Sequence, residues 1–280
     1  GGAVSCRAVR TGVGRGWGER GAGAGPASRM SGVGRGRGGG GGPGGLGSFW
    51  TTDLRLKGAA GSTVSLEFHT ADSNTDAATA TAQVTMTSPV MYLADVMKTV
   101  LGLDTAFGNI LIRGSRPVSA TIRTYARAGN GSYGSSFMAM PVSTAMRGSG
   151  GMMGDDDQYR LYVQGLLPEP QARVNVVVTN AGSVPVSGTM DLVDADGQPP
   201  IGGGSSLPFS IRAYSAHQFG DVLAGFTSHF GDGSGMQVRV RLADGSSGMV
   251  MVLASVVDNT TNDGYTVMGS MMDSARGMMP

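Results

Sequence analysis

The stretch that decides the fold is Trp50-Thr51-Thr52-Asp53-Leu54-Arg55-Leu56, whose even-numbered residues form one face and whose odd-numbered polar residues form the other. A period of two is typical of a β-strand with one buried face. The same period recurs at residues 64–69, 82–86 and 237–242, and clusters of Gly, Ala, Asp and Ser separate the alternating segments. Short strands with regular turns predict an all-β protein built from antiparallel sheets that pack as a sandwich.

Several segments occur twice, in the same order. The matched pairs are 52–56 with 174–178, 92–97 with 218–223, 110–112 with 238–240, and 118–126 with 249–257. This repetition predicts two tandem Ig-like β-sandwiches from an internal duplication. We expect unit 1 at residues 48–146, a linker at 147–157, unit 2 at 158–270 and a flexible Met-rich end at 271–280.

Each copy also contains one Asp-Val pair before a short apolar stretch. The pairs are Asp95-Val96 and Asp221-Val222, and each predicts one short helix with the aspartate as its cap. The copies differ at their start, because residues 159–164 predict a first strand in unit 2 for which unit 1 has only a glycine-rich tail.

Residues 1–47 form this tail, with 20 of the 49 glycines, seven arginines and one acidic residue. Its sparse apolar residues cannot offset the entropy lost on folding, so we expect a disordered Gly/Arg-rich segment. Residues 34–39 are similar to the Arg-Gly boxes of RNA-binding tails. We favour a truncated or misread N-terminus over an RNA-binding arm, so nucleic acid is not an expected partner.

Residues 50–56, Leu93-Ala94-Asp95-Val96 and Arg123-Thr124-Tyr125 together carry a family resemblance, and residues 174–182 and 255–259 look like its second copy. The pattern resembles a group of exported bacterial tandem β-sandwich repeat proteins whose function is uncharacterised. It is also distantly similar to the β-sandwich transducer of a bacterial sensory rhodopsin. The resemblance implies an extracytoplasmic or secreted protein, although no signal peptide is visible in residues 1–47, and it carries no functional residues over.

The chain offers little for catalysis or metal binding. Cys6 is the only cysteine, so neither an intrachain disulfide nor a cysteine metal cluster is expected. The histidines, His69, His217 and His229, lack metal-ligand spacing and are expected at the surface or in turns, and no G-x-S-x-G motif occurs. No apolar run approaches the roughly 18 residues of a membrane helix. We expect no enzymatic activity, no cofactor, no metal site and no membrane span.

These features favour a non-catalytic structural, adhesive or protein-interaction module at the cell surface or secreted. The alternative is a carbohydrate- or small-ligand-binding accessory module, which requires exposed aromatic side chains grouped on one face. A protein partner or self-association is expected in the first case.

One strand predicts where that partner binds. Residues 118–126 have a polar outward face, whereas the matched segment 249–257 places Met249, Met251 and Leu253 inward and an apolar set outward. The outward set, our interface candidates, is Val250, Val252, Ala254 and Val256. Because an apolar stripe in water invites association, we expect unit 1 or a second copy of the chain to cover these four residues. The alternative is that a loop or the C-terminal Met-rich segment folds over them.

Overall fold

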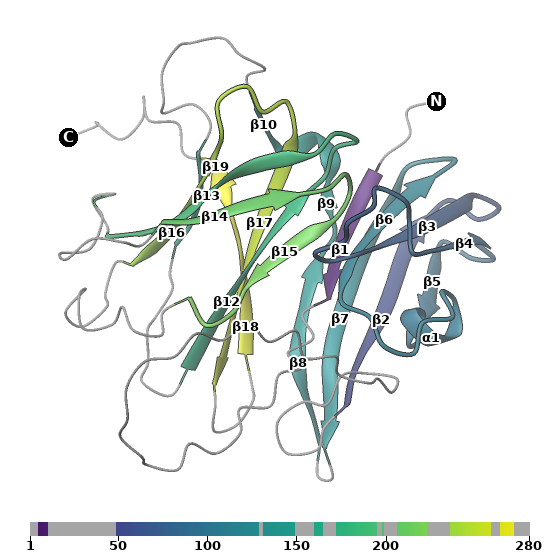
Figure 1. Cartoon of the computed structure of the whole chain (residues 1–280). Coiled ribbons are helices and arrows are strands. Elements are labelled where there is room, and N and C mark those ends of the chain that lie inside the picture. The colour runs from purple at the N-terminus through teal and green to yellow at the C-terminus, as the bar shows by residue number, and fades with distance from the viewer. Residues whose placement is uncertain are drawn as a thin grey trace, which may run out of the picture.

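The structure is a computed structural model that describes residues 5–10, 49–128, 131–148, 160–164, 172–194, 198, 206–222, 236–258 and 264–271. Within these ranges the protein is almost entirely β, and the predicted all-β class is confirmed. Two β-sandwich units lie side by side, and β8 and β18 run close together where the units meet (Figure 1).

Unit 1 consists of two antiparallel sheets. Sheet A has the order β4 (Ala80–Thr85), β3 (Thr63–Thr70), β6 (Gly108–Gly114), β1 (Ser5–Arg10) and β9 (Met140–Pro141). Sheet B has the order β5 (Val90–Leu93), β2 (Phe49–Gly58), β7 (Val118–Ala128) and β8 (Gly131–Met138). The helix α1 (Val96–Thr99) follows β5, and a 3-10 turn (Val142–Thr144) follows β9.

Unit 2 also consists of two antiparallel sheets. Sheet D has the order β14 (Ser206–Ile211), β13 (Val186–Val193), β16 (Gln237–Leu242), β11 (Arg160–Val163) and β19 (Ser270–Met271). Sheet C has the order β15 (Ala216–Phe219), β12 (Ala172–Asn180) and β17 (Met249–Asp258), and β17 also pairs with β10 (Met146–Arg147) and β18 (Gly264–Met268).

The two units have the same strand order. Each strand from β1 to β9 corresponds to the strand numbered ten higher in unit 2, so that β1 matches β11 and β9 matches β19. Corresponding strands have corresponding neighbours in the sheets. The register agrees as well: Leu54 lies opposite Ile122 in unit 1, as Val176 lies opposite Ala254 in unit 2. This shared topology is what an internal duplication requires, although the common origin of the units stays a prediction.

Apolar side chains from the facing sheets fill each sandwich. The core of unit 1 includes five fully buried side chains: Leu54, Leu66, Phe68, Ile112 and Ile122. Val96 and Met97 of α1 also belong to this core. The core of unit 2 is formed mainly by valines, among them Val176, Val238 and Val240. The helix predicted after Asp221 lies outside the described residues.

The expectation that residues 1–47 form no regular structure is wrong for Ser5–Arg10, which form β1. This strand pairs with β6 and β9, and it occupies the place that β11 takes between β16 and β19 in unit 2. The sandwich leaves backbone groups of β6 to be paired, and pairing them stabilises a segment too poor in apolar residues to fold alone. The remainder of residues 1–47 lies outside the described part.

Two predicted boundaries also fall within strands. Met146 and Arg147, at the expected end of unit 1, form β10 in a sheet of unit 2, where Met146 is buried in the core. Met271, at the start of the predicted flexible end, belongs to β19 and pairs with Leu161. Residues 149–159 of the expected linker and residues 272–280 lie outside the described part.

Candidate interaction site between the two units

A polar seam joins a loop of unit 1 to a turn of unit 2; we define it as Thr70, Asp72 and Asp76 with Ala213, Ser215 and Ala216. The Asp72 backbone N–H donates to the Ala216 carbonyl at 2.8 Å, and the Ser215 hydroxyl donates to the Thr70 carbonyl at 2.7 Å. The Ala213 N–H donates to the Asp76 carboxylate at 3.0 Å. These bonds satisfy loop backbone groups that would otherwise need water, so the two units dock with matched polar groups.

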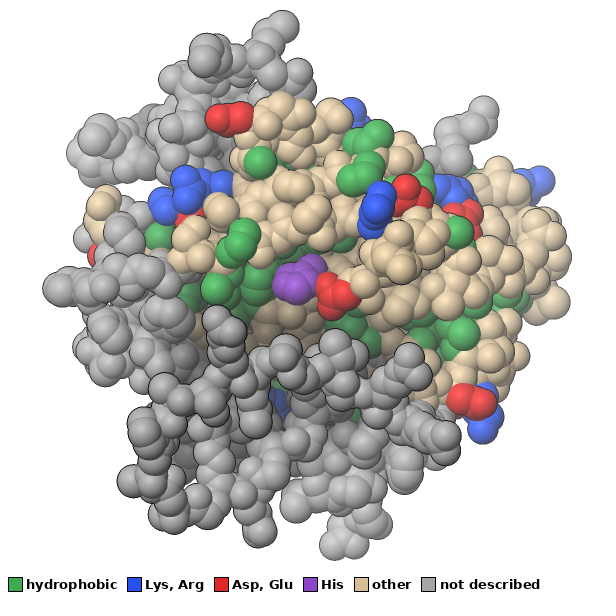
Figure 2. Space-filling model, in the orientation of Figure 1, with side chains coloured by type: hydrophobic (Ala, Val, Ile, Leu, Met, Phe, Trp, Pro, Cys, Tyr) green, Lys and Arg blue, Asp and Glu red, His purple; other side chains and the backbone are tan. Residues whose placement is uncertain are grey.

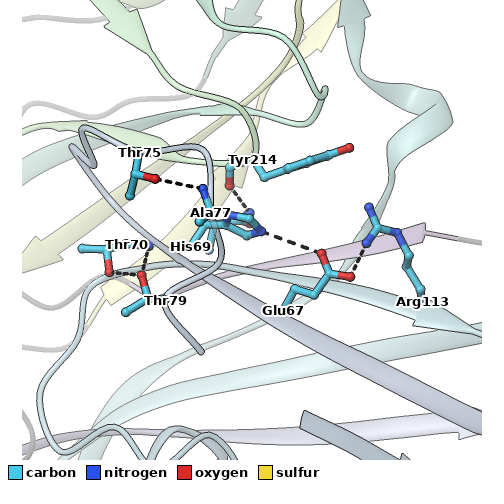
Figure 3. Close-up of polar contacts among 9 residues, drawn as sticks. Glu67, His69, Thr70, Thr75, Ala77, Thr79, Arg113 and Tyr214 are labelled. Atoms are coloured by element: carbon cyan, nitrogen blue, oxygen red, sulfur yellow. Dashed lines mark hydrogen bonds and ion pairs between the residues drawn. The ribbon is translucent and has the colours of Figure 1, made fainter. Parts of the chain in front are cut away.

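Beside the seam, a cluster of aromatic and charged side chains lies on the outer face of sheet A (Figure 3). We call Glu67, His69, Asn109, Arg113 and Tyr214 the histidine cluster. The His69 ring lies 5.3 Å from the Tyr214 ring, and its Nε2 lies 3.9 Å from Glu67 Oε2. Glu67 also pairs with Arg113, whose guanidinium lies 5.6 Å from the centroid of the Tyr214 ring.

The histidine cluster holds the turn of unit 2 onto unit 1. Asn109 Nδ2 donates to the backbone carbonyl of Tyr214 at 2.7 Å, and Tyr214 has a φ of 57°, an uncommon value for a bulky residue. The expected surface position of His69 is wrong, because only 3% of it is exposed. Its side chain leaves the outer face of β3, as the alternation predicts, but unit 2 covers that face.

His217, the second described histidine, lies at the edge of the seam. Its Nδ1 is paired with the carboxylate of Asp72, and its ring packs edge-on against Phe219 with centroids 4.5 Å apart. About a third of the side chain is exposed, which agrees with the expected surface position. His229 lies outside the described residues.

Two apolar clusters complete the contact. In one, Val177 and Ala216 of unit 2 pack against Ala71, Phe107 and Phe137 of unit 1. The other contains Met251, Ala181 and Met249 of unit 2 with Met140, Val142 and Ala145 from the end of unit 1. Between them lies a small apolar groove lined by Phe137, Met138, Met140, Thr179, Met251, Val252, Leu253 and Met268. Flexible methionine side chains suit a joint between two rigid sheets, because they fill irregular gaps.

The four interface candidates do not face unit 1 or the solvent. Val250, Val252, Ala254 and Val256 belong to the hydrophobic core of unit 2. The expectation is wrong because Val118 corresponds to Val250 in the sheets, not to Met249. A shift of one residue exchanges the two faces of a strand. The face that unit 1 contacts carries Met249, Met251 and Leu253, which were expected inside.

The repeated aspartates lie at equivalent places, and Asp95, which precedes the described helix α1, does not cap it with its side chain. Asp95 and Asp221 have φ values of 44° and 43°, and Asp95 makes no side-chain cap to α1. Instead their backbone N–H groups donate to buried side chains of the neighbouring strand, Asp95 to Asp53 at 2.9 Å and Asp221 to Asn175 at 3.1 Å. Tyr92 also donates to Asp53. This hydrogen bond is the main cause that raises the pKa of Tyr92, and the partial burial of the hydroxyl group is the second cause.

A second repeated feature was missed in the sequence: an acidic residue on β3 or β13 that pairs with an arginine diagonally across from it on the adjacent strand, β6 or β16. Glu67 pairs with Arg113 in unit 1, and Asp191 binds Arg241 at 2.8 Å and Arg239 at 3.2 Å in unit 2. Burial by itself raises the pKa of Asp191, but hydrogen bonds from Arg241 and Ser206 and the two arginine charges hold it below its usual range. The signal was present, because aligning the two copies places Glu67 on Asp191 and Arg113 on Arg241.

Within the described ranges, no group of three His, Cys, Asp or Glu side chains is placed to hold a metal ion. No helix of that part of the chain is long and apolar enough to span a membrane. Comparisons of the chain with protein-family models, curated proteins and solved structures find no match. The resemblance to exported bacterial β-sandwich repeats therefore stays a prediction.

Proposed function

We propose that this protein is a non-catalytic, extracytoplasmic protein-interaction module in which two docked β-sandwiches present the edges of their sheets to a protein partner or to another copy of the chain. The observation that carries the proposal is where exposed apolar side chains lie. Of the large apolar residues that are exposed in the described part, all but Val184 are on edge strands. They are Val90 and Tyr92 on β5, Met138 on β8, Leu207 on β14, Tyr265 on β18 and Met271 on β19.

Edge strands with apolar side chains are suited to binding another strand. β8 and β18 lie against each other at the junction of the units, whereas β5, β14 and β19 have no further paired strand among the described residues on their outer side. A strand added to one of these three edges gains backbone hydrogen bonds as well as apolar burial. Full burial of one such side chain contributes roughly 1.5–3 kcal/mol. In Figure 2 the exposed apolar side chains of one face lie in small separate groups among polar ones, which fits several narrow contacts better than one broad patch.

The junction between the units supports the same proposal. The polar seam, the histidine cluster, two apolar clusters and the pairing of β10 with β17 connect the units. A joint with this many independent contacts holds the sheet edges of both units in one arrangement. Such rigidity favours a scaffold, because a partner that contacts both units then loses little conformational entropy on binding. The extracytoplasmic location rests on the family resemblance alone.

The test uses two valines with the same exposure. Val90 on edge strand β5 and Val184 in the turn between β12 and β13 are each 40% exposed. We expect the full chain to self-associate in sedimentation-velocity experiments over a wide concentration range. A lysine on an edge strand opposes pairing, so Val90→Lys should weaken this association about tenfold while Val184→Lys leaves it unchanged.

Three outcomes would contradict the proposed binding role, and a fourth would contradict the non-catalytic assignment. The first is a chain that stays monomeric at every concentration, and the second is an equal effect of the two lysine variants. The third is specific binding on a glycan array, which would support the alternative of a carbohydrate-binding accessory module. Turnover in a panel of hydrolase substrates would contradict the non-catalytic assignment.

A further inference from the structure

Strand β1 occupies its place in unit 1 with smaller side chains than its counterpart in unit 2. By register, Cys6 stands opposite Ile112 where Leu161 stands opposite Val240, and Ala8 stands opposite Ile110 where Val163 stands opposite Val238. Leu161 and Val163 are buried in the core of unit 2. As residue types, cysteine and alanine offer less apolar surface for burial than leucine and valine do.

The connection that follows β1 is also much longer. The 38 residues between Arg10 and Phe49 include 18 glycines, whereas eight residues separate Val163 from Ala172. A chain of that length spans roughly 125 Å when extended, so β1 can reach the same place in a neighbouring molecule.

The place itself must be filled by some strand. It lies between β6 and β9, and the neighbouring Ile110 and Ile112 of β6 are core residues with 3% and 0% exposure. Without β1, the edge of β6 would leave backbone groups unpaired beside this core. Figure 1 shows β1 as a separate purple arrow beside β6. A strand of small residue types, a connection long enough to reach a neighbouring molecule and a place that requires a strand together allow exchange between identical chains.

We propose that the place between β6 and β9 accepts β1 from a second copy of this chain, so that unit 1 forms strand-exchanged dimers or longer head-to-tail assemblies. The inference rests on the proposed function, since it names a second copy of this chain as the partner and adds a contact, between β6 and β9, to the exposed sheet edges proposed above. It requires no new interface chemistry, because the exchanged strand makes in the partner the pairings that β1 makes in its own chain.

The single native cysteine provides the test. Cys6 lies opposite Pro141, an exposed residue of β9, and paired residues of antiparallel strands have Cα atoms about 4.5–5.5 Å apart, within the range for a disulfide. We expect oxidised Pro141→Cys to form disulfide-linked dimers and larger species on a non-reducing gel, in a fraction that rises with protein concentration. A second version in a Cys6→Ser background joins Arg7→Cys to Met140→Cys, the neighbouring pair.

The matched control is the equivalent pair in unit 2, Tyr162→Cys with Ser270→Cys in the Cys6→Ser background. Its short tether should keep the disulfide within one chain at every concentration. Exclusively intrachain disulfides in both unit 1 variants would overturn strand exchange, and so would the failure of either to form a disulfide. If strand exchange fails this test but the wild-type chain self-associates and Val90→Lys weakens the self-association, the proposed function stands without the exchange. A chain that is strictly monomeric would contradict both the exchange and the proposed function.

Discussion

Strand β7 of unit 1 and strand β17 of unit 2 hold the same place in the same topology, yet their outer faces differ. Thr121 and Arg123 of β7 are exposed, whereas Leu253 and Ser255 at the corresponding positions of β17 are buried. The adjacent strands differ in the same way, since Arg55 of β2 is exposed and Val177 of β12 packs against unit 1.

This difference shows how one scaffold serves two purposes. Sheet B of unit 1 keeps a polar outer face across β2 and β7, and sheet C of unit 2 has exchanged that face for an apolar one that docks the other unit. The inward faces stay equivalent, because both sandwiches need a core. The units therefore differ on the outer faces of these two sheets, and substitutions at matched positions can measure that difference.

The largest effect is expected from an arginine at a matched outer position of the two strands. Leu253→Arg places a charge at a residue that is 3% exposed, and it should lower the free energy of unfolding by about 3–5 kcal/mol. Thr121→Arg at the equivalent exposed position should change it by less than about 0.5 kcal/mol. Chemical denaturation of both variants measures the difference, and equal effects would mean that the outer face of β17 is not covered.

A pair of glycines tests whether the units are equivalent in their backbone packing. Gly134 and Gly264 stand at the same register position, and an added Cβ would lie 2.2 Å from the Thr124 carbonyl oxygen in one unit and 2.4 Å from the Val256 carbonyl oxygen in the other. We expect Gly134→Ala and Gly264→Ala each to lower the unfolding free energy by about 2–3 kcal/mol. Ser132→Ala, at an exposed position of β8, is the control. A tolerated alanine in only one unit would show that the two strand pairs differ.

The buried acceptors Asp53 and Asn175 offer a finer comparison. Asp53 accepts hydrogen bonds from the Asp95 N–H and from the Tyr92 hydroxyl group. Asn175 accepts the bond equivalent to the first of these, from the Asp221 N–H. Alanine leaves a buried donor without its acceptor, which costs about 1–2 kcal/mol at Asn175 and more at Asp53. Thermal unfolding of Asp53→Ala and Asn175→Ala tests this order. The reverse order would contradict it, and Asp53→Asn should recover part of the loss by restoring an oxygen acceptor.

The smallest effect concerns the repeated ion pair and depends on pH. The pKa of Asp191 is lower in the folded protein than its ordinary value of 3.8, so the ionised carboxylate stabilises the fold above that pH. This contribution is lost as the pH falls through the folded-state pKa. At neutral pH, Asp191→Asn should lower the unfolding free energy by about 1 kcal/mol.

Denaturation at several pH values measures this contribution, with Asp244→Asn in an exposed turn as the control for the loss of one carboxylate. The difference between wild type and Asp191→Asn should shrink below about pH 3.8. A difference that stays constant down to low pH would contradict the assignment.

By itself the sequence determined the all-β class, and it predicted two sandwich units whose strands follow one another in the same order along the chain. Alternation with a period of two identifies strands with one wet face, as in residues 50–56 and 64–69, and the repeated segments predict one topology for both units. It also located the equivalent pair Asp95 and Asp221, although not their left-handed backbone.

Only the tertiary structure decided which face of β17 is inside, where β1 belongs and why His69 is buried. When a strand is apolar on both faces, its sequence does not indicate which face is buried in the core. A shift of one residue in the alignment therefore exchanges the predicted inward and outward positions of Val252 and Leu253. The segment Ser5–Arg10 is too short and too polar for its sequence to predict a strand. It forms β1 because its backbone pairs with the edge of β6. His69 follows the polar pattern of an exposed residue, and it is buried because a second unit, distant in sequence, packs over it.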